Sequence, residues 1–250
     1  RALRELPLQL SEVRFDRYYP LQGNLRDLLK QPLFLEGAVA VQDPAAWLMV
    51  KLLGLQPGDR LLDLCAAPGG KSALVLDEFP GVELVAADLD QRRVRLMEDL
   101  ERRQGKELMR VVADGLHPPF KKGSFSHILL DAPCSNLGVV RRRPEALWKI
   151  GPDSLQRLSD LQYRLLCSAA SLLSSGGVLV YGTCSPEIEE SYLVVDKFLK
   201  EHPDWSLAPA REYIPRRYLH RHCLRVIPTP GSVDGFFGAR LQHRPVGGEE

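Results

Sequence analysis

The chain is short of cysteine and of net charge, and each shortage excludes a class of protein. Its five cysteines among 250 residues are odd in number, irregularly spaced and free of any Cys-x-x-Cys pair. Such usage is atypical of a disulfide framework or a zinc site, so we expect no metal and reduced thiols, as in the cytoplasm. The net charge is only +1. Because no whole-molecule field would attract nucleic acid, any such affinity must come from local cationic clusters.

Long apolar runs are lacking as well. No run of about 18 apolar residues, the length of a membrane span, occurs in the chain, and nothing after Arg1 has the pattern of a secretory signal. We therefore expect no membrane partner and a cytoplasmic location. A monomer is also expected, although the sequence does not fix the oligomeric state. With 44% hydrophobic residues, the chain is long enough to bury one main core.

Short apolar runs alternate with helical patterns from Asp59 onward. The runs are rich in Val, Leu or Ile and predict buried strands at residues 60–64, 83–87, 109–113, 127–130 and 178–181. Apolar residues at three- and four-residue steps predict helices over 91–103 and 153–173, and Asp43 is expected to cap another over 45–53. This order predicts an α/β, Rossmann-like fold with a mostly parallel, doubly wound sheet. Two further strands, at 224–227 and 236–241 around a Pro-Thr-Pro-Gly-Ser turn, predict a terminal antiparallel hairpin.

The first predicted strand leads directly into a glycine turn and then a helix, over residues 61–72. In an open α/β sheet the ligand crevice lies beyond the carboxyl ends of the strands, where glycines let a ligand approach and helix N–H groups are free. Cys65 replaces the first glycine of a phosphate loop, which disfavours ATP. Asp88, about twenty residues past the glycines, is placed to bind two ribose hydroxyls. This favours a cofactor that contains adenosine.

Aspartates also end the next two predicted strands. Asp114 is a candidate to contact the adenine edge, and Asp131 follows the fourth strand. Any one of these carboxylates is also typical of a helix cap or a surface loop. Four consecutive strands that end in the glycine turn or in an aspartate favour one shared ligand site.

Five blocks of sequence are more specific than the strand pattern. They include Asp-Ala-Pro-Cys-Ser and Tyr-Gly-Thr-Cys-Ser, and they occupy residues 62–71, 131–135, 141–148, 181–185 and 234–237. Between Val39 and Leu241 the chain resembles the Sun family of RNA cytosine-C5 methyltransferases. The resemblance implies S-adenosyl-L-methionine as the cofactor and RNA, 16S ribosomal RNA above all, as the partner. The cofactor contacts that it implies are Cys65, Ala66, Ala67, Pro68, Gly69, Gly70, Lys71, Asp88, Asp114 and Asp131.

Two cysteine motifs point to covalent catalysis. Carbon 5 of cytosine is a poor nucleophile, and a thiolate that adds to carbon 6 makes carbon 5 reactive. A cation such as Lys71 or the cofactor sulfonium would favour the thiolate, and Asp131 would hydrogen-bond the pyrimidine near nitrogen 3 and its amine. Spacing leaves open which thiol attacks. The resemblance implies that Cys184 is the nucleophile and that Cys134 assists product release.

Other positions carry weaker expectations. The cluster Arg141, Arg142 and Arg143 predicts contacts to RNA phosphates, with a solvated loop as the alternative. Trp148 is either a core residue or a stacking platform, and a core position is favoured. Cys167 is expected in the core. Asn136 and Leu137 stand where the family commonly has two small residues.

The resemblance also bears on domain organisation. Residues 1–38 are expected to be an extension left from an RNA-binding region, residues 39–243 the catalytic domain, and residues 244–250 a flexible tail. Bacterial members usually carry an N-terminal helical domain and an RNA-binding module, so an N-terminal RNA-binding domain is expected to be missing here.

Two other functions remain open. A DNA cytosine-C5 methyltransferase would use Cys134 as its nucleophile, but it would have no use for the Thr183-Cys184 motif. A ribosome-assembly factor that keeps only the cofactor site would need neither thiol nor Asp131.

Overall fold

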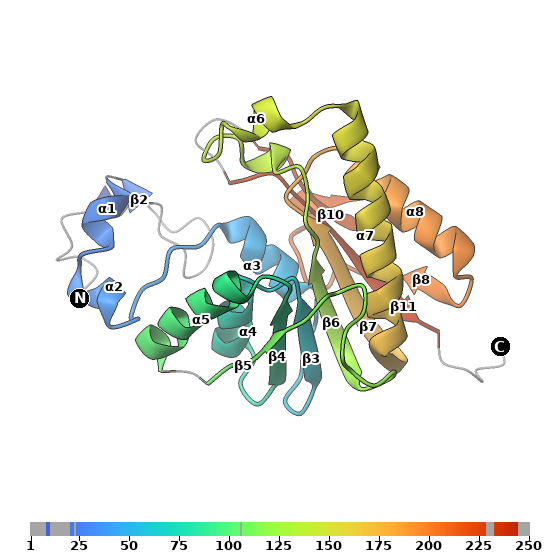
Figure 1. Ribbon diagram of the computed structural model, residues 1–250, viewed down its shortest axis with the longest axis horizontal. Helices are drawn as coiled ribbons and strands as arrows, with labels where there is room; N and C mark the ends of the chain where they lie inside the picture. Colours follow the sequence, from blue (N-terminus) through green and yellow to red (C-terminus); the bar gives the residue numbers. More distant parts are fainter. Residues whose placement is uncertain (1–8, 11–20, 23, 106, 229–232, 245–250) are drawn as a thin grey trace.

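The computed structural model describes residues 9–10, 21–22, 24–105, 107–228 and 233–244. Its central feature is a sheet in the order β5-β4-β3-β6-β7-β11-β10-β9, with β8 paired to β11 (Figure 1). The parallel strands are β3 (Arg60–Leu64), β4 (Glu83–Asp88), β5 (Met109–Val112), β6 (Phe125–Asp131) and β7 (Leu173–Thr183). The antiparallel strands are β8 (Trp205–Leu207), β9 (Leu219–His220), β10 (Cys223–Val226) and β11 (Phe236–His243). The predicted α/β class is confirmed.

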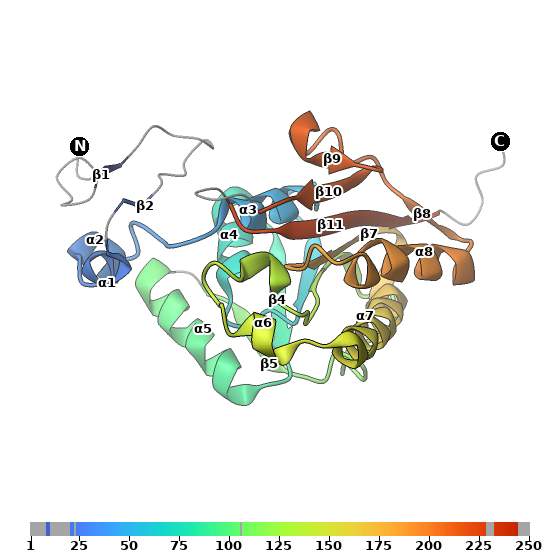
Figure 2. The ribbon, with the colours of Figure 1, turned by 90° about the horizontal axis from the view of Figure 1, so that it is seen from above.

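Alternate side chains of the parallel strands enter two cores, one on each face of the sheet. Leu62 and Leu64 of β3 belong to one cluster, and Leu61 belongs to the other. The first cluster includes α7 (Pro152–Leu172) and α8 (Tyr192–Glu201), and the second includes α3 (Pro44–Lys51), α4 (Gly70–Glu78) and α5 (Gln91–Gln104). Figure 2 shows α3 and α7 on opposite sides of the sheet. Because both faces are covered, these strands direct apolar side chains to both sides of the sheet.

The helices begin where the sequence predicts. The Asp43 carboxylate accepts a hydrogen bond from Ala45 N at 2.8 Å, and Pro44 takes the first helical position of α3, where no N–H is needed. Shorter helices are α1 (Leu25–Leu28), α2 (Pro32–Leu35) and α6 (Ala146–Lys149). In the described part of the chain, no helix combines the length and the apolar character that a membrane crossing requires.

Four strands are longer than predicted, namely β4, β6, β7 and β11, and β7 extends the furthest. β7 begins at Leu173, directly after α7, and pairs there with Phe125 of β6. Ser174 and Gly176 interrupt the apolar pattern in this stretch, so the sequence signal begins only at Val178. The expected hairpin of β10 and β11 is confirmed, with Leu224 opposite Gly238.

Some expectations fall on residues that the structure does not describe. These are the hairpin turn at 229–232, the tail beyond Arg244, and residues 1–8, 11–20 and 23 of the predicted extension. Within the extension, β1 (Gln9–Leu10) pairs with β2 (Leu21–Gln22).

Candidate active site

Parallel pairing brings the predicted site residues to one edge of the sheet. Cys65, Asp88 and Asp131 lie at the carboxyl ends of β3, β4 and β6, and Cys184 follows β7. β6 and β7 are neighbours, with Asp131 opposite Gly182. In Figure 1 α6 lies above this edge, and Figure 2 looks onto it. The two cysteine motifs therefore meet as predicted.

The glycine turn leaves β3 through a backbone conformation that few other residues adopt. Gly69 has φ +95° and precedes α4, and a Cβ there would lie 3.0 Å from Met97 Cγ. Cys65 has φ +66° although it carries a side chain. Burial raises the pKa of Cys65 to about 12, so its thiol stays protonated and lines the turn.

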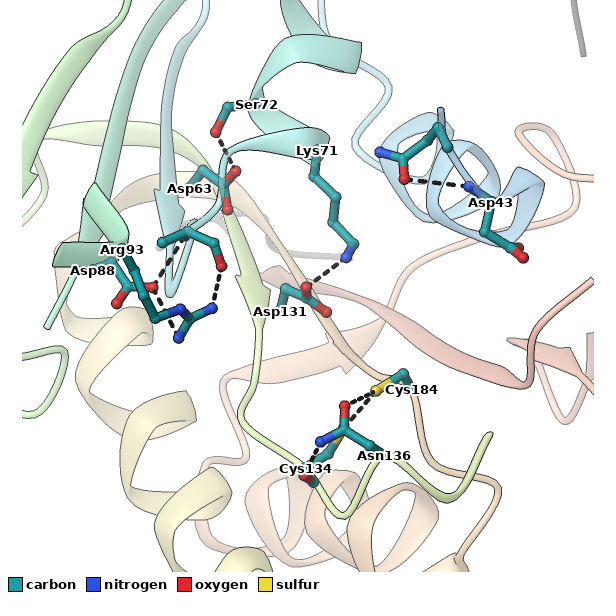
Figure 3. A network of polar contacts seen from close by, with 12 residues as sticks. Asp43, Asp63, Lys71, Ser72, Asp88, Arg93, Asp131, Cys134, Asn136 and Cys184 are labelled. Atoms are coloured by element: carbon teal, nitrogen blue, oxygen red, sulfur yellow. Dashed lines mark hydrogen bonds and ion pairs between the residues drawn. The ribbon is translucent and has the colours of Figure 1, made fainter. Parts of the chain in front are cut away.

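Asp88 stabilises this turn. Its buried carboxylate accepts hydrogen bonds from Ala67 N at 3.0 Å and from Asp90 N at 3.1 Å. Arg93 Nη1 lies 3.7 Å from Asp88 Oδ2, and the same guanidinium donates to the Ala67 carbonyl (Figure 3). Sequence reasoning identified Asp88 but not Arg93, because an arginine on a helix surface is usually solvated.

Asp63 places a second carboxylate beneath the turn. Ser72 Oγ donates to its Oδ2 at 2.6 Å, whereas Oδ1 is buried without a hydrogen-bond partner among the described residues. Burial raises the pKa of Asp63 to about 7, and the nearby Asp131 carboxylate contributes to this shift. A buried acceptor without a donor is costly. Together with the glycine turn, it fits a polar cofactor that brings its own donor, as the predicted S-adenosylmethionine would.

Lys71 and Asp131 form an ion pair between the turn and the cysteines. Lys71 Nζ lies 2.5 Å from Asp131 Oδ2 (Figure 3). It also lies 5.0 Å from the centre of the Phe236 ring. Burial lowers the pKa of Lys71, but the Asp131 carboxylate more than compensates, so the pKa is raised and the ammonium stays charged.

The two thiols are in direct contact. Cys134 Sγ lies 2.9 Å from Cys184 Sγ, and Cys184 Sγ lies 3.1 Å from Asn136 Oδ1. The hydrogen bond to Cys184, and then burial, raise the pKa of Cys134 well above its ordinary value. At neutral pH Cys134 is therefore a protonated thiol that faces Cys184.

Asn136 is a site residue that sequence reasoning did not assign. It has φ +62°, which asparagine tolerates better than most residues, and its amide donates to the Cys134 carbonyl at 3.1 Å. One feature of the sequence could have indicated this role: Asn136 stands where the family commonly has a small residue. Close by, a Cβ on Gly138 would lie 2.6 Å from the Cys184 carbonyl oxygen, so only glycine lets the two loops pack this closely.

The arginine cluster divides into two parts. Arg142 forms an ion pair with Asp234, and Arg141 Nη2 lies 3.6 Å from the same carboxylate, whose side chain is 1% exposed. Asp234 N in turn donates to Asp43 Oδ2 at 3.1 Å. Two arginines thus connect the loop after Cys134 to the segment before β11. Arg143 is exposed and has no ion pair with another described residue.

Three remaining expectations have different outcomes. The core position expected for Trp148 is wrong, because the side chain is 88% exposed on the single-turn helix α6, where Ala146 alone is buried among the described side chains. Cys167 is half-buried and packs against the core from α7. Asp114 is half-buried, and its Oδ1 accepts from Leu116 N at 2.9 Å, as in the loop alternative.

Comparison with known proteins identifies relatives of the chain. Residues 50–242 match the family model described as 16S rRNA methyltransferase RsmB/F. A protein named ribosomal RNA small subunit methyltransferase B, from Sodalis glossinidius (strain morsitans), is 38% identical over 212 residues, which are 84% of this chain and 48% of that protein. The chain thus spans about half the length of the curated relatives it matches.

Two solved structures are also similar. PH0851 has a TM-score of 0.85 at 31% identity, covering 96% of this chain and 55% of that one. NSun6 from Pyrococcus horikoshii, described with SFG, has a TM-score of 0.74 at 26% identity, covering 86% and 56% of the two chains. The fold is therefore that of the S-adenosylmethionine-dependent methyltransferases.

We expect Asp63 to make stability depend on pH. Because its pKa rises from 3.8 to about 7 on folding, its contribution to stability is fully present below pH about 4 and is lost as pH rises through about 7. The loss should be on the order of 1.4 kcal/mol per pKa unit. Denaturant unfolding should show a fall in the free energy of unfolding over this window that Asp63→Asn lacks. Asp99→Asn, at an exposed site, should keep it. If the free energy of unfolding depends on pH in the same way in the wild type and in Asp63→Asn, the raised pKa of Asp63 is refuted.

Proposed function

The chain belongs to the 16S rRNA methyltransferase RsmB/F family, and on that premise we propose that it methylates carbon 5 of a cytosine in RNA, with S-adenosylmethionine as the methyl donor. The observation that carries the proposal is the thiol pair, with Cys134 Sγ and Cys184 Sγ 2.9 Å apart beyond the ends of neighbouring strands. A pure binding module has no need of two thiols in contact beside a cofactor turn. The substrate that we propose is 16S ribosomal RNA, after which the family is named.

The cofactor would lie against the glycine turn. The turn from Cys65 to Lys71 offers backbone N–H groups at the start of α4, and the unpaired Asp63 Oδ1 is available to a donor. Asp88 is the proposed partner of the ribose, and Asp114 that of the adenine. The similar NSun6 is described with SFG, an S-adenosylmethionine analogue, which supports this choice. When bound, the cofactor supplies an electrophilic methyl group.

Cys184 is the proposed nucleophile. Its sulfur would bond to carbon 6 of the cytosine, which makes carbon 5 electron-rich. The resemblance to the Sun family supports this assignment, because in that family the thiol of the Thr-Cys motif is the nucleophile. The charged Lys71 ammonium supplies a positive field at this end of the sheet.

Asp131 is the proposed partner of the pyrimidine. Only its Oδ2 is bonded to another described residue, Lys71, and the side chain is 29% exposed. Oδ1 is thus available to a base that enters beside the cysteines. The ion pair keeps the carboxylate fixed at the place where charge would develop on the ring.

The exposed surface above the site is the proposed RNA contact. Arg143 and Trp148 follow the Cys134 loop, and both side chains reach solvent. A guanidinium can hold a phosphate, and an exposed indole can stack on an unpaired base. Arg141 and Arg142 would add positive charge to this surface while they remain paired with Asp234.

The first expected result concerns the cofactor. Asp88→Ala should weaken the binding of S-adenosylhomocysteine roughly ten- to a hundredfold, because a charge-assisted hydrogen bond contributes about 1.5–3 kcal/mol. Isothermal titration calorimetry measures this. Asp196→Ala, at an exposed position on α8, should bind like the wild type. Unchanged affinity in Asp88→Ala would remove Asp88 from the site.

The second concerns the two cysteines, which act on opposite sides of the covalent intermediate. Cys184→Ser should abolish methylation and form no protein–RNA bond. Cys134→Ser should still allow attack, so that an RNA adduct accumulates with cofactor and survives denaturing electrophoresis. The reverse pattern would make Cys134 the nucleophile, as in the DNA enzymes. If both variants methylate RNA normally, the thiol mechanism is wrong.

The third concerns RNA binding. Arg143→Ala should reduce the slope of log affinity against log salt by about 0.7–0.9, the contribution of one neutralised phosphate. Trp148→Ala should lower affinity by about 1–3 kcal/mol and leave the slope unchanged, because stacking releases no counterions. Lys121→Ala, in the loop that leads into the opposite end of β6, is the matched control. If Arg143→Ala leaves the salt slope unchanged, the side chain of Arg143 contacts no RNA phosphate and belongs to a solvated loop.

A further inference from the structure

A buried polar network lies beneath the two thiols, and the proposed reaction does not use it. Its members come from α7, from β7, from the loops after β6 and β7, and from the 3-10 turn Ile188–Glu190. All are at most 3% exposed, and they are Ser135, Gln162, Tyr181, Ser185 and Glu190.

Glu190 is bonded to the residue that follows Cys134. Its Oε1 accepts from Ser135 N at 2.8 Å, and its Oε2 accepts from Ser135 Oγ at 2.5 Å. Gln162 Nε2 donates to the same Oε1 at 3.0 Å and to the Pro133 carbonyl at 2.9 Å. The main chain is therefore held on both sides of Cys134, at the carbonyl before it and at the N–H after it.

The same residue reaches the Cys184 loop. The Tyr181 hydroxyl donates to the Glu190 carbonyl at 2.7 Å, from the strand that leads to Cys184. The hydroxyl oxygens of Ser135 and Ser185, each one residue past a cysteine, lie 3.1 Å apart. Glu190 thus connects the two loops whose thiols touch.

Burying a carboxylate between two loops costs folding free energy. Among the described residues no cation pairs with Glu190, and its partners are two N–H groups and a hydroxyl. A buried charge without a counter-ion is expensive, and an apolar contact would cost less. Three well-formed donors make the charge tolerable, and they also fix its position closely.

We propose that Glu190, with Gln162, is a positioning residue that holds the Cys134 thiol against Cys184 and so determines how fast the enzyme leaves the methylated base. The inference rests on the proposed function. In the release step the carbon 5–hydrogen bond breaks, the proton passes to water, and its electron pair forms the double bond to carbon 6. The carbon 6–sulfur bond breaks, and Cys184 leaves as a thiolate. The Cys134 S–H, held at 2.9 Å, donates a hydrogen bond to that departing sulfur.

The test separates methyl transfer from release. Under single-turnover conditions, with an unmodified 16S rRNA transcript and S-adenosylmethionine, Glu190→Gln should transfer methyl within about threefold of the wild-type rate. Release of the adduct should slow by about tenfold or more, which corresponds to about 1.4 kcal/mol. Glu187→Gln, a half-buried neighbour in the same segment, should match the wild type in both rates.

A double variant distinguishes positioning from general damage. Because Glu190 acts through Cys134, adding Glu190→Gln to Cys134→Ser should not slow release further. Additive slowing, or equal loss of both rates in Glu190→Gln, would overturn the inference.

Two further controls keep the result decisive. Should Glu190→Gln not fold, Gln162→Met removes the bond to Pro133 and should slow release in the same way, and normal release in that variant would refute the inference. If the wild type neither forms an adduct nor methylates RNA, the proposed function itself fails. If the wild type and Cys134→Ser behave as expected but Glu190→Gln releases RNA normally, only the positioning role fails.

Discussion

The parallel pairing of β6 with β7 is the constraint on which the site depends. It sets Asp131 opposite Gly182, so that the chain leaves both strands at the same edge and the two thiols come within 2.9 Å. The loops then bond to each other directly, with Gly138 N donating to the Cys184 carbonyl at 2.9 Å. A slip of one residue in this register would turn every side chain of one strand to the other face and separate the cysteines.

Charges near the glycine turn are arranged in pairs, with one exception. Arg93 faces Asp88, and Lys71 faces Asp131, so each of these carboxylates lies beside a cation. Asp63 has only Ser72, and burial raises its pKa to about 7. An incompletely satisfied carboxylate is where a ligand gains most, because a donor from that ligand removes an existing cost. In the proposed function, a cofactor at the turn would supply the hydrogen-bond donor that Asp63 Oδ1 lacks among the described residues.

The segment after Cys134 combines a fixed and an exposed part. Arg141 and Arg142 are tied to the buried Asp234, whereas Arg143 and Trp148 reach solvent. The ion pairs keep the loop against the sheet, so that the exposed side chains are presented from a fixed base. In the proposed function, this surface would hold the RNA while one nucleotide enters the site.

Local patterns in the sequence determined the order of strands and helices, the glycine turn, the strand-end aspartates and the two cysteine motifs, because periodicity and turn chemistry act over a few neighbouring residues. The resemblance added which thiol should attack. Tertiary structure decided the rest, since the partners are far apart in the chain. Arg142 meets Asp234 across 92 positions, and Ser135 meets Glu190 across 55. Trp148 is exposed because no element of the described chain packs over it, and the orphaned oxygen of Asp63 exists because the sheet and α4 close around it. No pattern of neighbours encodes such contacts, which arise only when the two faces of the sheet are covered.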